Sequence, residues 1–181
     1  HTGEPYSARA VGESIERLFA TGRFADIRAE AALLNEGVAV TFVTAGQYFA
    51  GDVRVRGVEA PPSETQLRVA AGLDLGSAVS ESSLTRAAES LKGLLSEQGY
   101  FEPTITWEER RHPDTQQSSI EFQIKAKPRA RLGKVVFEGD DQFPAARLLD
   151  EADWKAGDHV DSDRLQKGLG RLRDLYRDEG F

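Results

Sequence analysis

The stretch LLSEQGYF (residues 94–101) recurs in closely similar form as LYRDEGF (175–181). Upstream of these stretches, residues 76–100 align without a gap on residues 157–181, at a constant offset of 81. In each copy a run of spaced leucines leads to a glycine that is followed by an aromatic residue. Similarity at a fixed spacing is typical of repeat architectures, and it decides how the rest of the chain is interpreted.

The repeat also includes the segment before the long helix. GDVRVRG (51–57) aligns on GKVVFEG (133–139) at an offset of 82, and a weaker copy of the helix and its glycine lies in residues 3–24. The sequence therefore predicts a tandem array with one whole unit flanked by parts of two others. The predicted units are the C-terminal part of a first module at 1–47, a complete module at 48–128 and the N-terminal part of a third at 129–181.

The complete unit has the pattern of an α+β layer. Val53 and Val55 alternate with charged residues, which predicts a half-buried strand, and a short helix follows that is bounded by prolines and a glycine. Leucines and alanines from Leu84 to Leu95 follow helical spacing and predict one buried stripe. Two further alternating segments complete the order strand–helix–helix–strand–strand, which predicts a three-stranded sheet covered on one face by two helices.

The strand predicted at 101–108 has the features of a sheet edge. Pro103 has no amide hydrogen and so cannot donate to a central ladder. An edge strand exposes unpaired backbone groups that an extended peptide can pair with, and this needs little sequence specificity. We therefore predict that this edge strand binds an extended peptide, with a groove for apolar side chains beside the 84–98 helix. The predicted site residues are Phe101, Glu102, Thr104, Thr106, Trp107 and Glu108.

Glycines recur where the predicted helices end. Gly22, Gly99 and Gly180 each occupy the position at which a helix terminates through a left-handed residue, so we predict that they are structural helix caps. An aromatic residue follows each glycine closely, and we expect these side chains to pack between helix and sheet rather than to bind a partner. The aromatic residues are Phe24, Phe101 and Phe181.

Composition excludes several classes of function. The net charge of −7 over 181 residues argues against a nucleic-acid scaffold, which needs a basic face. The apolar runs are too short for a transmembrane helix, and the chain has no cysteine, which excludes disulfides and thiolate chemistry. The residues ERRH (109–112), together with Arg129 and Arg131, form a modest basic spot that we interpret as a solvated turn rather than a contact for an acidic partner.

The titratable residues do not form a recognisable catalytic or metal site. His1, His112 and His159 lack the spacing of metal ligands, so we expect no metal and no cofactor. The adjacent acids Glu108 and Glu109 should point to opposite faces of a strand, which argues against a shared catalytic pocket. No phosphate-binding loop or nucleophile elbow is present, and we predict that the chain is not an enzyme.

The order of these features resembles that of POTRA modules, the polypeptide-transport-associated repeats of BamA- and TamA-like outer-membrane assembly proteins. The residues that carry the resemblance are the opening strands (VRVRG, VVFEG), the glycine before each long helix (LDLGSAVSESSL, WKAGDHVDSDRL) and the helix ends (LLSEQGYF, LYRDEGF). The resemblance implies tandem modules, each with a three-stranded mixed sheet in which the last strand is central and the penultimate one is an edge.

The resemblance also implies a location and partners. It implies a periplasmic scaffold attached to an outer-membrane barrel in the parent protein, receiving unfolded outer-membrane proteins and docking periplasmic accessory proteins. A second hypothesis is that the modules act as a spacer or docking unit, and a third is that they belong to a two-partner secretion transporter.

The two partial units suggest self-association. The first lacks an opening strand and the third lacks a closing hairpin, so each has an apolar face or strand edge without a partner in the same unit. We expect residues 1–45 of one copy to pack against 130–181 of another.

Overall fold

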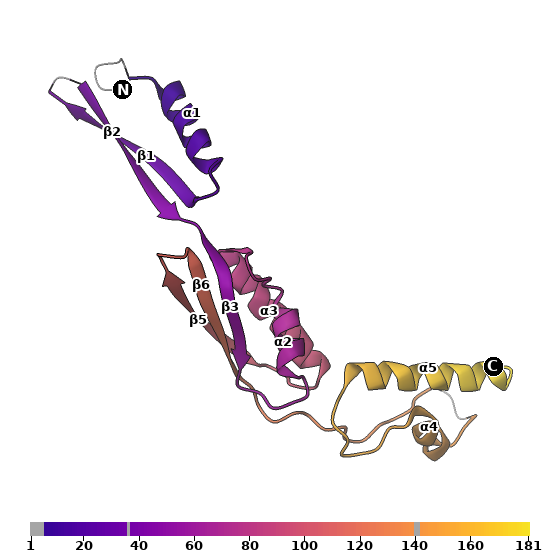
Figure 1. Ribbon diagram of the computed structural model, residues 1–181. Coiled ribbons are helices and arrows are strands. Elements are labelled where there is room, and N and C mark those ends of the chain that lie inside the picture. The colour runs from indigo at the N-terminus through magenta and orange to yellow at the C-terminus, as the bar shows by residue number, and fades with distance from the viewer. Residues whose placement is uncertain (1–5, 36, 140–141) are drawn as a thin grey trace. The chain divides into compact units, whose positions relative to one another are not determined.

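The computed structural model describes residues 6–35, 37–139 and 142–181 (Figure 1). The chain forms two compact units. One contains the chain up to Val53 with Asp74–Glu81 and Glu109–Ile120, and the other contains Arg54–Leu73, Ser82–Glu108 and Glu121–Phe181. Within the described part of the chain, no helix is both long and apolar enough to cross a membrane.

The first repeat forms a helix and a long hairpin. Helix α1 (Ala8–Phe19) precedes strands β1 (Phe24–Leu34) and β2 (Gly37–Gly46), which pair antiparallel in a two-stranded sheet. Ile27 is buried, whereas Leu33, at the far end of the same face, is 89% exposed. The hairpin therefore buries its apolar face only near its start.

The second repeat confirms the predicted α+β order. Its strands form a sheet in the order β4-β3-β6-β5, in which β4 has only two residues, and α2 and α3 lie on the same side of the long strands (Figure 1). The elements are β3 (Tyr48–Arg56), α2 (Glu64–Ala71), β4 (Ala78–Val79), α3 (Glu81–Glu97), β5 (Thr104–His112) and β6 (Gln117–Lys125).

Side-chain periodicity explains this core. Alternate residues of each strand are buried because successive side chains point to opposite faces of a sheet. The long helix buries one stripe at intervals of three and four residues, which is the spacing that aligns side chains on one helix face. The buried residues include Val53 and Val55 of β3, Ile120, Phe122 and Ile124 of β6, and Leu84, Ala87, Ala88, Leu91 and Leu95 of α3.

The third repeat has its own small core. Helices α4 (Ala145–Ala152) and α5 (Ser162–Asp178) pack around Phe143, Leu148 and Leu172. The ring of Phe143 meets that of Tyr176 edge-on, with centroids 5.1 Å apart. This aromatic pairing and the helix contacts give the repeat a core without a hairpin.

One predicted strand is absent. The segment 133–139 aligns with part of β3 but is not assigned as a strand, although the Arg131 backbone forms a bridge with His159 just before it. A strand requires a neighbour to complete its ladder, and within the described residues no strand lies beside this segment. Its alternating pattern is therefore insufficient by itself to form a strand.

Two of the three recurring aromatic residues are more exposed than we predicted. Phe101 is 51% exposed and Phe181 is 65% exposed. The backbone of Glu102 has a φ of 55°, so the alternation of faces expected for a continuous strand does not reach back to Phe101. Phe181 nevertheless contacts Phe143 edge-on at a centroid distance of 6.0 Å.

We predict that the chain associates through its two partial repeats, with residues 1–45 of one copy against 130–181 of another. Val38, on the apolar face of β2, is 38% exposed and should be covered in the complex. Light scattering across a concentration series should show a growing dimer fraction, which Val38→Glu should reduce. The matched control Val69→Glu alters an exposed valine of α2 and should leave association unchanged. A strict monomer at high concentration would contradict this prediction.

Candidate peptide-binding edge strand

Strand β5 lies at an edge of the four-stranded sheet. In the order β4-β3-β6-β5 the last strand in sequence, β6, is internal, and the penultimate strand β5 is terminal. Among the residues that the structure describes, no other strand pairs with β5 besides β6. This agrees with the prediction from Pro103, which immediately precedes the strand. One side of the β5 backbone is thus available for pairing.

The two faces of β5 differ in character. Thr104, Thr106 and Glu108 are exposed, whereas Ile105 is 8% exposed and belongs to the core. The half-buried ring of Trp107 lies 6.2 Å from that of Phe122, measured between centroids. Trp107 therefore packs the edge strand against the central strand, on the face that the helices cover.

The strand begins and ends later than predicted, at Thr104 rather than 101 and at His112 rather than 108. Phe101 and Glu102 accordingly lie ahead of it, and an exposed ion pair of 3.2 Å joins Glu102 to Lys127. The left-handed backbone at Glu102 and the missing amide hydrogen of Pro103 explain why the ladder cannot start earlier. The residues of the predicted site that share the strand are Thr104, Thr106, Trp107 and Glu108.

A polar cluster fixes the far end of β5. The Glu109 carboxylate accepts hydrogen bonds from Arg111 Nε at 3.0 Å, from Arg111 Nη2 at 2.9 Å and from the hydroxyl of Ser118 at 2.6 Å. The guanidinium of Arg111 also lies over the ring of Tyr48, 5.2 Å from its centroid. Ser118 is fully buried, so the carboxylate supplies the acceptor that its hydroxyl needs.

This cluster perturbs the carboxyl group. The hydrogen bonds from Arg111 lower the pKa of Glu109, with a smaller contribution from Ser118, and they outweigh the opposing effect of burial. From the sequence, Glu109 was considered only as a neighbour of Glu108 and as part of the basic spot at 109–112. The spacing of Glu109 and Arg111 was the available signal, because residues two apart on a strand share a face.

The two described histidines lie in different places. His112 Nε2 lies 3.0 Å from the hydroxyl of Ser119, and His159 belongs to the backbone bridge with Arg131. His1 lies outside the described residues. Within the described residues, no group of three or more histidine, aspartate or glutamate residues could hold a metal ion.

Comparisons with known proteins identify the repeat. Residues 130–181 match the POTRA family, described as a surface antigen variable number repeat. The resemblance to POTRA repeats inferred from the sequence is therefore confirmed for this segment. A comparison with curated proteins found no match.

Solved structures similar to this chain have low sequence identity. BamA POTRA3-5 of Haemophilus influenzae is 18% identical, with 96% of this chain and 72% of that chain covered and a TM-score of 0.44. The N-terminal domain of Omp85 from Thermosynechococcus elongatus is 19% identical, with coverages of 94% and 73% and a TM-score of 0.45. CdiB from Acinetobacter baumannii is 16% identical, with coverages of 88% and 30% and a TM-score of 0.39.

We predict that the Glu109 cluster stabilises the fold in a pH-dependent way. Because the pKa of Glu109 is lowered in the folded state, the stabilisation is complete above the pKa of the unfolded chain and is lost as the pH falls through the folded-state value. Glu109→Gln should lower the free energy of unfolding by about 1 kcal/mol at neutral pH, as expected for a partly exposed charged hydrogen bond.

Urea denaturation at about pH 7 and about pH 3 measures this effect, because a larger fraction of the carboxyl groups is protonated at the lower value. The difference between wild type and variant should shrink in acid. Glu108→Gln is the matched control, because it makes the same chemical change on the exposed face and should have little effect. A Glu109→Gln difference of equal size at both pH values would contradict the assignment.

Proposed function

We propose that this chain is a periplasmic protein-binding scaffold of an outer-membrane protein assembly or translocation factor. The POTRA match at residues 130–181 supports the class of protein, and the free edge of β5 is the observation that carries the mechanism. In this proposal the chain receives unfolded outer-membrane clients, whose extended segments add to β5 as a further strand. A membrane barrel follows in the parent protein, and accessory periplasmic proteins are further partners.

The backbone of β5 supplies the affinity. Nine residues of extended chain, Thr104–His112, offer alternating amide and carbonyl groups along the open side. An added strand pairs with these groups whatever its side chains, so one site accepts many client sequences. This property suits a receptor for proteins whose shared feature is a tendency to form strands.

The side chains of β5 place weak demands on the client. On the open face Thr104 and Thr106 present small β-branched side chains, and Glu108 and Arg110 follow with opposite charges. Cross-strand contacts of such residues contribute roughly 0.2–1 kcal/mol each, which biases the register without fixing one sequence. On the opposite face, client side chains would lie near Trp107 and the flank of α3, where apolar residues are favoured.

We predict a period-two pattern of protection along β5 when a strand-forming peptide from a barrel protein binds. Successive amides of a strand point to opposite edges, so the added strand can protect only every second amide between Thr104 and His112. Amide hydrogen exchange with and without peptide measures this pattern. A proline placed at one of the newly protected positions should weaken binding because it removes a donor.

The matched control is the same peptide with N-methyl groups on the amides that would face β5. It keeps every side chain but cannot donate the backbone hydrogen bonds, so it should bind weakly. Equal affinity of the two peptides, or protection confined to loops and helices, would contradict edge-strand addition. Absence of any response to the peptides would favour the spacer function.

A further inference from the structure

The segment that follows β6 is held by residues of two different repeats. The amide of Ala130 donates to the carbonyl of Gly99 at 2.8 Å, and the carbonyl of Ala130 accepts from the amide of Val160 at 2.9 Å. Gly99 follows α3 of the second repeat, and Val160 lies just before α5 of the third. Ala130 thus joins the end of one long helix to the start of the next.

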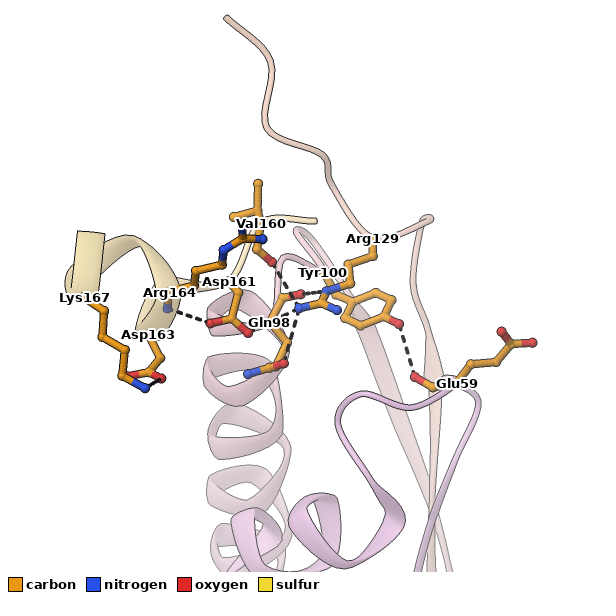
Figure 2. A network of polar contacts seen from close by, with 9 residues as sticks. All are labelled: Glu59, Gln98, Tyr100, Arg129, Val160, Asp161, Asp163, Arg164 and Lys167. Atoms are coloured by element: carbon orange, nitrogen blue, oxygen red, sulfur yellow. Dashed lines mark hydrogen bonds and ion pairs between the residues drawn. The ribbon is translucent and has the colours of Figure 1, made fainter. Parts of the chain in front are cut away.

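The side chain of Arg129 strengthens this joint. Its Nε donates to the carbonyl of Gln98, and its Nη2 lies 3.3 Å from the carbonyl of Val160 and 3.4 Å from the carboxylate of Asp161. Figure 2 shows the guanidinium between these groups. The Arg129 side chain is only 12% exposed, so these contacts replace most of its contact with water.

Both helix ends suit a cation at this position. Gln98 directly follows the last turn of α3, where the free carbonyl groups carry partial negative charge. Asp161 is the N-cap of α5, and its carboxylate accepts the amide of Arg164 at 3.0 Å. One guanidinium therefore connects the C-terminal end of α3 to the capping group of α5, with a planar set of donors that a neutral amide does not have.

Gly99 allows the two repeats to approach closely. Its φ is 83°, and a Cβ atom at this position would lie 2.5 Å from the carbonyl oxygen of Val160. Helix termination was the reason predicted for this glycine from the sequence, and the close contact with Val160 is a second reason. Gly22 has a φ of 67° and no atom within 4 Å of such a Cβ, so it lacks the second constraint.

Where the first repeat meets the second, a different residue makes a similar contact. The offset of 82 that aligns residues 51–57 with 133–139 places Gln47 at the position of Arg129. Gln47 Nε2 lies 3.5 Å from the carbonyl of Val79, the counterpart of Val160, and 2.9 Å from that of Tyr48. Gln47 thus contacts the carbonyl group that corresponds to that of Val160, but its side chain is a neutral amide where Arg129 is charged.

We propose that Arg129 is the residue that locks the second and third repeats together, fixing the direction of α5 relative to α3. The guanidinium of Arg129 binds the end of α3 and the start of α5. Because Gly99 has no side chain, these two ends lie close enough for one guanidinium to contact both. Arg129 is thus a positioning residue, and its effect on the joint is independent of client binding at β5.

Distances between two spin labels test this proposal directly. The chain has no cysteine, so Ser90→Cys on α3 and Arg173→Cys on α5 introduce specific labelling sites at exposed positions. Double electron–electron resonance should give a narrow distance distribution, and Arg129→Gln should at least double its width. Arg131→Gln is the matched control. Arg131 lies two residues further on, and its Nη1 donates at 2.7 Å to Gly157 within the third repeat, so the distribution should stay narrow.

A second pair of variants tests the close approach without changing charge. Gly99→Ala should shift and broaden the distribution, because its Cβ meets Val160, whereas Gly22→Ala introduces similar backbone strain in open space and should not. Circular dichroism confirms that the variants keep their helices. An unchanged width in Arg129→Gln, or equal broadening in Arg131→Gln, would overturn the proposal. An unchanged distribution in Gly99→Ala would do the same.

Discussion

In the second and third repeats, two backbone hydrogen bonds hold the opening segment against the loop that precedes the long helix. In the second repeat the amide of Ala50 donates to Ser77 at 2.8 Å, and the amide of Gly76 donates back to Ala50 at 2.7 Å. Gly76 has a φ of 83°, a left-handed conformation that favours glycine. In the third repeat the corresponding bonds are both 2.7 Å long and join Leu132 to Asp158 and Gly157 to Leu132.

This clamp determines where the remaining elements lie. It places β3 beside the short strand β4, so the long helix α3 starts immediately after the clamped loop at Glu81. The buried residues of α3 then pack in the core with β6, and β5 occupies the edge of the sheet beside β6. Among the described residues the third repeat forms the clamp with no strand beside 133–139, so the clamp does not depend on a completed sheet. The free edge therefore follows from the strand order β4-β3-β6-β5, in which β5 is the terminal strand.

The sequence predicted the parts of the fold that depend on periodicity, and it missed those that depend on distant contacts. Repeat spacing, strand alternation and the stripe of α3 led to the α+β order and to an edge strand near Pro103. The contacts of Arg129 were missed because its acceptors lie 31 residues upstream and 31 and 32 residues downstream, so that in the sequence it was only part of a basic spot. Local pattern predicted that Phe101 begins an edge strand and that 133–139 forms a strand. The left-handed residue Glu102 separates Phe101 from β5, and among the described residues no strand lies beside 133–139.

The most direct test of this account is amide hydrogen exchange at the clamp residues of the 181-residue chain. The account predicts that the amides of Leu132 and Gly157 exchange slowly, as do those of Ala50 and Gly76, because the same two hydrogen bonds hold both repeats. Protection at Ala50 and Gly76, with Leu132 and Gly157 exchanging as fast as in an unfolded peptide, would contradict the claim that the clamp forms without the completed sheet.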